Sequence, residues 1–324
     1  MIILGSPYLV QVNALTRCFF GCSYCYLKNF YLNTDYFLPL ADYRRFLDKF
    51  STYHSNYGLD LRVDLTGGDL WLHPEYGQII EETVKRNYIT KIGLMVNSLW
   101  HKQARQAIKK IGKKLVTVQL NIDAYLKDTN DADIEFLLKE NIPTGIKILL
   151  SKNGDYFKFQ LKILRRLNKK YPDLKVSVDR LCPTNESQIQ QVIVGSEMEK
   201  RLEKVKSVNA QFVTEDPLLS AKRKIIECEE DDLVGCSIPN GALTLYPDGK
   251  VKLCARIPSF ETGFTIDNFD LLDYVGEMDW VIKARSKGCD GCALIARCRG
   301  GCPATSFIYN GGKIGRDINC VLVK

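Results

Sequence analysis

The alternation of short apolar runs with amphipathic segments constrains the fold of this chain more than any other feature. Six runs rich in β-branched and aromatic residues are predicted strands: Tyr8–Leu15, Leu61–Thr66, Lys91–Asn97, Leu115–Asp123, Thr144–Ser151 and Lys175–Leu181. Apolar residues at helical spacing predict helices between them: Leu40–Phe50, Pro74–Arg86, Lys102–Ile111, Ala132–Glu140 and Tyr156–Lys169. Repeated βα units favour parallel strands with right-handed crossovers, in either a doubly wound sheet or an incomplete (β/α) barrel. Both folds place their chemistry at the carboxyl ends of the strands.

The last third of the chain has a different pattern. The βα rhythm stops near residue 183, and a polar helical stretch at Glu186–Lys206 follows. Eight of the twelve cysteines fall within the last 97 residues, where a hairpin is predicted between Ala242 and Cys254. Few long apolar runs remain there, so we expect metal to organise this part in place of a large apolar core. The 324 residues therefore divide into two predicted domains, 1–207 and 208–324.

Composition narrows the class of protein. The first ten residues carry no positive charge and no run reaches membrane-spanning length, so we expect a soluble cytoplasmic protein without a membrane partner. In that compartment, twelve cysteines indicate metal binding or catalysis rather than disulfides. The basic run His101–Lys114 has apolar residues at helical spacing, which favours an amphipathic helix over a nucleic-acid patch, and no nucleic-acid partner is expected. The chain has no P-loop and no dinucleotide fingerprint.

The stretch TRCFFGCSYCY places Cys18, Cys22 and Cys25 directly after the first predicted strand. Three thiolates leave one iron of a 4Fe-4S cluster open, and an open metal position can hold a small chelating molecule. The second predicted strand ends in TGGD, Thr66 to Asp69, where glycine permits close approach of the backbone to a ligand. For this turn alone, the competing interpretation is an ordinary βα turn in which Asp69 caps the next helix.

Together these motifs resemble the radical S-adenosylmethionine (SAM) superfamily, whose cysteine triplet has this spacing and an aromatic residue, here Tyr24, before the third cysteine. VNS after the third predicted strand and LNID after the fourth extend the resemblance. It implies an α/β fold with a partial (β/α)6 TIM-like barrel, a 4Fe-4S cluster held by the triplet, and SAM bound at the open iron. The implied SAM contacts are Tyr24, Gly67, Gly68, Asp69, Asn97, Asn121 and Asp123. The chain departs from the family pattern at Asp69, where glutamate is usual, and at Phe19, where relatives often carry asparagine.

The carboxy-terminal cysteines resemble the SPASM extension, a cysteine-rich iron-sulfur domain found in part of this superfamily. By position, the resemblance implies an auxiliary cluster I held by Cys228, Cys236, Cys254 and Cys302. It also implies an auxiliary cluster II held by Cys289, Cys292, Cys298 and Cys320. The expected cofactors are thus SAM and three 4Fe-4S clusters, one catalytic and two auxiliary. The alternatives are structural zinc sites, or a scaffold that only transfers electrons.

The resemblance implies an oxidoreductase-type enzyme that works under anaerobic conditions and generates a 5'-deoxyadenosyl radical to abstract hydrogen from its substrate. Because SPASM relatives most often act on peptides, the leading hypothesis is oxidative crosslinking, by a thioether or a carbon-carbon bond, of a ribosomally made peptide. Only seventeen residues precede Cys18, so we expect a peptide substrate to need either a separate leader-recognition protein or direct binding by the enzyme. The expected electron donor is a flavodoxin or a ferredoxin. Ala255 follows Cys254 where sulfatase-maturing relatives carry an aspartate base, which argues against that activity.

Cys182 is the one cysteine outside these sets, and it follows the sixth predicted strand. A thiol at a carboxyl end could give a hydrogen atom to a substrate radical, as a radical epimerase of a peptide or a sugar requires. A small buried side chain is the competing interpretation of this residue. Dehydrogenation of a small carbohydrate alcohol is a third candidate activity.

Overall fold

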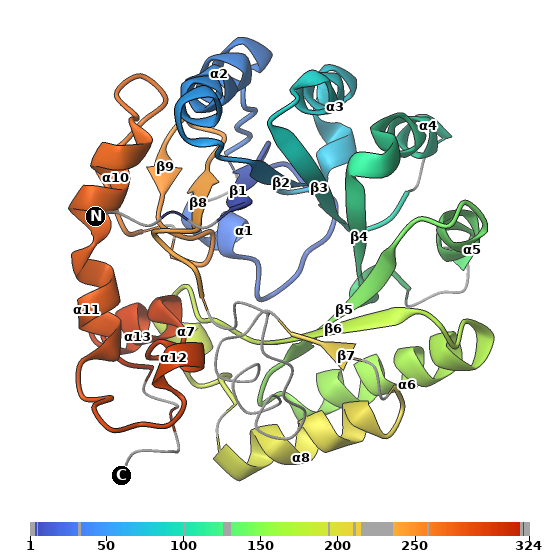
Figure 1. Ribbon diagram of the computed structural model, residues 1–324. Coiled ribbons are helices and arrows are strands. Elements are labelled where there is room, and N and C mark those ends of the chain that lie inside the picture. The colour runs from blue at the N-terminus through green and yellow to red at the C-terminus, as the bar shows by residue number, and fades with distance from the viewer. Residues whose placement is uncertain are drawn as a thin grey trace. The chain divides into compact units, whose positions relative to one another are not determined.

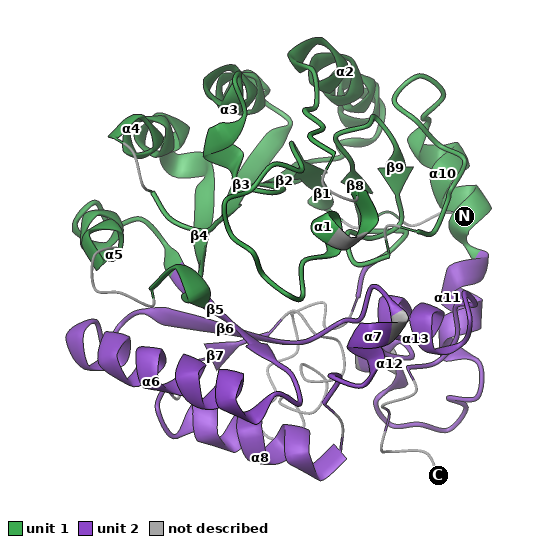
Figure 2. Cartoon of the chain, turned by 180° about the vertical axis from the view of Figure 1, so that it is seen from behind, with its two compact units in different colours: residues 1–144, 238–279 green, residues 145–237, 280–324 purple. Residues whose placement is uncertain are grey.

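The computed structural model (Figure 1) describes residues 4, 6–31, 34–99, 102–125, 131–193, 195–209, 212–214, 236–257, 259–317 and 320. The chain divides into two compact units, which Figure 2 colours separately. Unit 1 comprises residues 1–144 and 238–279, and unit 2 comprises residues 145–237 and 280–324. The predicted domain division at residue 207 stays a prediction.

Parallel strands form the centre of unit 1 (Figure 1). They are β1 (Tyr8–Asn13), β2 (Leu61–Thr66), β3 (Ile89–Val96) and β4 (Leu115–Asn121). All four are predicted strands, and their observed ends differ from the predicted ones by at most two residues. Val10, Val63 and Ile92 stand in register across β1, β2 and β3 and are fully buried. Such rows of apolar side chains explain why these strands read as apolar runs in the sequence.

The predicted hairpin is confirmed as β8 (Ala242–Leu245) and β9 (Val251–Lys252), which pair antiparallel. Gly249 adopts a φ of 79° in the connecting turn, a backbone conformation that favours glycine. The hairpin joins the sheet of unit 1, because β8 lies parallel to β1 with Leu243 opposite Val10. The strand order in unit 1 is therefore β4-β3-β2-β1-β8-β9.

Helices accompany the strands of unit 1, and α2, α3 and α4 lie along the outer side of the sheet (Figure 1). The helices are α1 (Tyr26–Tyr31), α2 (Leu40–Tyr57), α3 (Tyr76–Lys85), α4 (Lys102–Ile111), α5 (Asp131–Lys139) and α10 (Leu271–Met278). Helix α2 runs beyond its predicted end because Tyr53 continues the buried face, and Gly58 in a left-handed conformation ends it. Helix α4 is confirmed as amphipathic, with Ala104 and Ile108 among its buried residues. Helix α1 was not predicted.

Unit 2 contains β5 (Thr144–Leu150), β6 (Lys175–Arg180) and β7 (Phe212–Val213), which pair in parallel in that order. Its helices are α6 (Gly154–Lys170), α7 (Glu186–Ile189), α8 (Gly195–Lys206), α11 (Trp280–Ser286), α12 (Ile295–Cys298) and α13 (Pro303–Tyr309). The polar helix predicted at Glu186–Lys206 is interrupted between α7 and α8, where Val192 and Ile193 are buried. The predicted fold class, α/β with parallel strands and a cysteine-rich carboxy-terminal segment, is confirmed. No helix in the described ranges combines the length and the apolar character of a bilayer-crossing segment.

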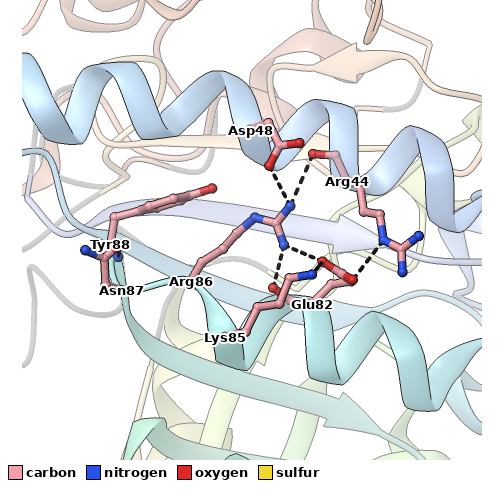
Figure 3. Close-up of a pocket in the computed structure, with 7 residues that line it drawn as sticks. All are labelled: Arg44, Asp48, Glu82, Lys85, Arg86, Asn87 and Tyr88. Carbon is pink, nitrogen blue, oxygen red and sulfur yellow. Dashed lines mark hydrogen bonds and ion pairs between the residues drawn. The ribbon is translucent and has the colours of Figure 1, made fainter.

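A charged pocket lies between α2 and the end of α3 in unit 1 (Figure 3). Its buried Glu82 pairs with three cations, at 2.8 Å from Arg44 Nε, 2.5 Å from Lys85 Nζ and 2.8 Å from Arg86 Nη1. Burial by itself would raise the pKa of the Glu82 carboxyl, but hydrogen bonds from Lys85, Arg86 and Arg44 outweigh burial and lower the pKa to about 2. Arg86 also pairs with Asp48 at 2.7 Å. The charged side chains that line the pocket are therefore paired with one another, which indicates a structural role.

Replacing Glu82 by glutamine should lower the free energy of unfolding by about 3 kcal/mol near neutral pH. The folded pKa lies below the unfolded value of about 4.3, so the stabilisation is complete above about pH 5 and is lost as the pH falls toward about 2. Urea denaturation near neutral pH and at about pH 3 should show the difference between wild type and Glu82→Gln shrinking in acid. The control is Glu81→Gln, which removes an exposed pair with Lys110 and should cost less than about 1 kcal/mol. A loss that is equal at both pH values would contradict the role assigned to the Glu82 charge.

Candidate active site

The three cysteines of the amino-terminal triplet lie on the loop that joins β1 to α1. The loop is attached at both ends. Leu15 forms an isolated bridge with Phe37, and the Tyr26 hydroxyl at the start of α1 donates to Asn13 Oδ1 at 2.7 Å. Asn13 is the last residue of β1, so the end of the strand also fixes the first residue after Cys25.

The TGGD turn after β2 packs directly on this loop. The N–H of Gly68 donates to the carbonyl of Leu15, and the N–H of Asp69 donates to the carbonyl of Arg17, both at 2.8 Å. A Cβ on Gly68 would lie 2.0 Å from the Arg17 oxygen, and one on Gly67 would lie 2.6 Å from the Leu15 oxygen. Gly67 also has a φ of 134°. Glycine is therefore required at both positions, because the backbone of Leu15 and Arg17 passes at contact distance.

Asp69 is fully buried beside the first cysteine. Its side chain makes no capping hydrogen bond to the short 3-10 helix that follows, so its interpretation as a helix cap is wrong. Burial raises the pKa of the Cys18 thiol to about 11, with the charges of Asp69, Cys22 and Cys25 adding to the effect and the N–H of Phe20 opposing it. The carboxylate of Asp69 and the three thiols thus occupy one site.

The carboxyl ends of β3 and β4 bring two asparagines to the same site. Asn97 Nδ2 donates to Cys18 Sγ at 3.5 Å. Asn121 Nδ2 lies 3.9 Å from Cys22 Sγ and 3.3 Å from Asn97 Oδ1. Both asparagines are predicted SAM contacts, and both also contact the cysteine sulfurs.

Tyr24 and Asp123 complete this group of residues. The Tyr24 hydroxyl donates to Asp123 Oδ2 at 2.5 Å, and it lies 3.3 Å from Asn121 Nδ2. The N–H of Asp123 in turn donates to Asn121 Oδ1 at 3.2 Å. All ten predicted residues of the catalytic cluster and SAM site therefore lie on the loops after β1, β2, β3 and β4 of unit 1 or at the end of β4.

The sulfur environment fits an iron-sulfur cluster. Each thiol accepts an N–H: Cys18 from the Phe20 backbone at 3.4 Å, Cys22 from Asn121, and Cys25 from the Lys28 backbone at 3.4 Å. Hydrogen bonds to sulfur are among the means by which proteins set the properties of such clusters. Burial raises the pKa of the Cys18 and Cys22 thiols, so a cation is needed to hold them as thiolates. Three thiols with N–H donors and no histidine are a donor set suited to iron in a cluster with one open position.

The cysteines assigned to auxiliary cluster II gather in unit 2. Burial raises the pKa of Cys298 to about 11, and the nearby Cys320 and Cys289 add to the effect. Burial also raises the pKa of Cys289, where the Arg316 cation acts in the opposite direction and Cys320 and Cys292 act in the same one. Cys292 also packs against the buried Cys298. Each of the four cysteines therefore interacts with at least one other in unit 2.

The four cysteines assigned to auxiliary cluster I are distributed differently. Cys254 belongs to unit 1, where its Sγ accepts the N–H of Arg256 at 3.4 Å. Cys236 and Cys302 belong to unit 2, and Cys228 lies outside the described residues. Among the described residues, no three histidine, cysteine or carboxylate side chains converge as the ligands of a single metal ion would.

Comparison with protein families decides the class of this site. A family model described as the radical SAM superfamily matches residues 12–193, which is more than half of the chain. The chain belongs to the radical SAM superfamily. It is therefore a radical SAM enzyme, for which SAM and an iron-sulfur cluster are the expected cofactors, and the predicted family is confirmed. Comparison with curated proteins gives no significant match.

Solved structures share the fold of this radical SAM enzyme. SuiB from Streptococcus suis bound to S-adenosylmethionine aligns with a TM-score of 0.71 at 18% identity, over 99% of this chain and 78% of SuiB. SuiB bound to the precursor peptide SuiA aligns with a TM-score of 0.72 at 19% identity, over 99% of this chain and 77% of SuiB. The protein anSMEcpe with bound AdoMet aligns with a TM-score of 0.69 at 13% identity, over 96% and 94% of the two chains. At these identities the similarity establishes the fold of nearly the whole chain.

Several residues of this radical SAM site were not found from the sequence. Asn13 and Tyr26 hold the loop, and the carbonyls of Leu15 and Arg17 receive the TGGD turn. Every residue has a backbone carbonyl, so the sequence does not show which carbonyls accept hydrogen bonds from the turn. The two glycines were the available signal, because a close approach requires them.

Replacing Gly68 by alanine should displace the cysteine loop, since the new Cβ would lie 2.0 Å from the Arg17 carbonyl oxygen. We expect a loss of stability of roughly 1–3 kcal/mol and a loss of about four iron atoms per chain after anaerobic reconstitution. Gly77→Ala is the matched control, because nothing lies within 4 Å of its added Cβ. Thermal unfolding and iron analysis check both variants. Full iron content in Gly68→Ala would show that the turn does not position the triplet.

Proposed function

We propose that this radical SAM enzyme oxidatively crosslinks a ribosomally made peptide, through a thioether or a carbon-carbon bond. The observation that carries the proposal is the similarity of nearly the whole chain to SuiB, a structure of which contains a precursor peptide. The structure of anSMEcpe with a bound Cp18Cys peptide, to which 95% of this chain aligns with a TM-score of 0.65, also supports a peptide substrate. A second set of gathered thiols, at Cys289 and Cys298, supports a reaction in which electrons leave the substrate.

In this proposal, Cys18, Cys22 and Cys25 hold the catalytic 4Fe-4S cluster and leave one iron for SAM. When bound, these cofactors supply the electron and the 5'-deoxyadenosyl radical that removes a hydrogen atom from an unactivated carbon. Buried Asp69 accepts the SAM amino group beside Gly67 and Gly68. The remaining SAM contacts are Tyr24, Asn97, Asn121 and Asp123, whose mutual hydrogen bonds fix their orientation.

Two auxiliary clusters are proposed, each with four cysteine ligands. Cluster I is assigned to Cys228, Cys236, Cys254 and Cys302, and cluster II to Cys289, Cys292, Cys298 and Cys320. Forming each crosslink removes two hydrogen atoms from the peptide. One leaves with the radical, and the other leaves as a proton and an electron. An auxiliary cluster held by these cysteines would supply the acceptor for that electron, and a flavodoxin or a ferredoxin is the proposed electron-carrier partner.

The proposal includes a partner protein and argues against sulfatase maturation. A separate leader-recognition protein presents the peptide, and the enzyme works in an anaerobic cytoplasm. Ala255, which follows Cys254, is buried and its carbonyl accepts a hydrogen bond from Tyr246 at 2.8 Å. The position therefore offers no carboxylate base, which supports crosslinking over sulfatase maturation.

The proposed clusters predict a characteristic iron count. Anaerobically reconstituted enzyme should contain about twelve iron atoms per chain. Cys18→Ala should lose about four and should form no 5'-deoxyadenosine after reduction. Cys298→Ala should also lose about four but should still form 5'-deoxyadenosine, because its cluster is not the one that binds SAM. Zinc in place of iron in wild-type enzyme would contradict the auxiliary clusters, and 5'-deoxyadenosine formation by Cys18→Ala would contradict the assignment of the triplet.

The substrate is tested by co-expressing the enzyme with each short peptide encoded next to its gene. High-resolution mass spectrometry should find a peptide lighter by two hydrogen atoms per modification, with fragment ions missing between the crosslinked residues. The same experiment with Cys18→Ala is the control and should leave the peptide unchanged. An unchanged peptide mass in ordinary water, with one carbon-bound deuterium gained when the reaction is run in deuterium oxide, would instead establish epimerisation and overturn crosslinking. Oxidation of added sugar alcohols with no change in any peptide would establish a dehydrogenase.

A further inference from the structure

Two thiols that lie far apart in the sequence are in contact within unit 2. Cys182 follows β6 by two residues, Cys302 directly precedes α13, and their Sγ atoms are 4.0 Å apart. Both cysteines are reduced and both belong to unit 2. A disulfide joins its sulfurs at about 2.0 Å, so a bond requires these two to approach by about 2 Å. Rotation about the side-chain bonds supplies a movement of that size.

The backbone of Cys302 is held by a buried ion pair. Arg180, the last residue of β6, is 2% exposed, and its Nη2 lies 2.7 Å from Oδ2 of the fully buried Asp317. The same Asp317 oxygen accepts the backbone N–H of Cys302 at 3.1 Å. One end of β6 therefore leads to Cys182 and also carries the guanidinium whose partner holds Cys302. The contact between the two thiols is thus built into the fold of unit 2.

The two glycines before Cys302 allow the chain to pass close to its neighbours. A Cβ on Gly300 would lie 1.9 Å from the Arg285 carbonyl oxygen, and one on Gly301 would lie 2.3 Å from the Asp317 Cβ. The Arg285 guanidinium also donates to the carbonyl of Gly301 at 3.0 Å. The backbone that carries Cys302 is therefore fixed on two sides, so the approach of the sulfurs falls to the side chains.

The two thiols differ in their access to solvent. Cys302 is 6% exposed, whereas Cys182 is partly exposed. A small molecule in solution therefore meets Cys182 first. The buried Thr305 on α13 contacts the same sulfur, with its Oγ1 3.6 Å from Cys182 Sγ. An accessible thiol beside a second, buried thiol is the arrangement of a redox-sensing pair with a resolving cysteine.

We infer that Cys182 and Cys302 form a redox-active dithiol that exchanges with small disulfides such as oxidised glutathione. In the first step, the Cys182 sulfur bonds to one sulfur of the small disulfide, whose S–S bond breaks and releases one small thiol. In the second step, the Cys302 sulfur bonds to the Cys182 sulfur and displaces the other small thiol. The cysteines lose two electrons and two protons in total, and the small disulfide gains them as two thiols.

The linked form withdraws the Cys302 sulfur from other chemistry. Under the proposed function Cys302 is an iron ligand, and only a thiolate binds metal. A small thiol reverses the exchange and returns both cysteines. The exchange itself needs no cluster, because it involves two thiols of unit 2 and a small disulfide. In a compartment that keeps thiols reduced, such a bond is transient and responds to oxidising conditions.

The test incubates the full chain, purified without iron under anaerobic conditions, with oxidised glutathione at about 1 mM. Digestion without reductant and mass spectrometry should find a Cys182–Cys302 linked peptide. It should be at least about tenfold more abundant than the mixed disulfide with glutathione, because thiols in contact react intramolecularly. An excess of reduced glutathione should remove the link.

Variants separate the roles of the two thiols. Cys302→Ala and Cys302→Ser should accumulate the mixed disulfide at Cys182, because no thiol resolves it. Cys182→Ala should leave the buried Cys302 reduced over the same period. Cys292→Ala removes another partly exposed thiol of unit 2 and is the matched control, which should form the link as the wild type does.

Three results would overturn the inference. A mixed disulfide that persists at Cys182 in the wild type would show that Cys302 does not resolve it. Glutathione bound to Cys302 in Cys182→Ala as fast as the link forms in the wild type would show that Cys182 is not the entry point. Links from Cys302 spread over several other cysteines would show that the pair is not preorganised. Failure of the proposed function leaves these outcomes unchanged, since the chain tested holds no iron.

Discussion

The active site depends on the contact between the TGGD turn and the cysteine loop. The β1–β2 ladder ends with Asn13 opposite Thr66, and the N–H of Gly68 continues it by donating to Leu15. Because there is no room for a Cβ at Gly68, the two backbones meet without an intervening side chain. The register of two parallel strands thus determines where the first thiol lies relative to the buried carboxylate that follows the glycines. Every other residue of the site is placed around this pair.

Much of this arrangement could be predicted from the sequence, and the failures have one cause. The six strands are buried parallel strands, which appear as apolar runs, and their carboxyl ends marked the candidate site residues. Helix α1 was missed because its stability comes from tertiary contact: Leu27 and Tyr31 pack with Tyr246, far away in the chain. The pairing of β8 with β1 was missed for the same reason. Periodicity reports which face of an element is buried, but it does not report the partner.

The two described groups of thiols are supported in different ways. The triplet sulfurs accept N–H groups from the backbone of Phe20 and Lys28 and from the side chain of Asn121. In unit 2, burial raises the pKa of Cys289 and of Cys298, and the rise is opposed by the Arg316 cation at Cys289 and by the Gly301 N–H at Cys298. A cation thus acts on a thiol of unit 2, whereas the donors to the triplet sulfurs are neutral N–H groups.

The buried ion pair at the end of β6 is explained by Cys302 rather than by stability. Taking Arg180 and Asp317 out of water is costly, and an apolar pair of similar volume often stabilises a core as well or better. An apolar pair, however, would leave the buried N–H of Cys302 without the acceptor that Asp317 provides at 3.1 Å. Because one carboxylate oxygen binds both this N–H and Arg180, the cysteine backbone is fixed to the strand that also carries Cys182. The desolvation cost is therefore the consequence of fixing the backbone of Cys302 to the end of β6, where the Cys182 sulfur lies 4.0 Å from the Cys302 sulfur.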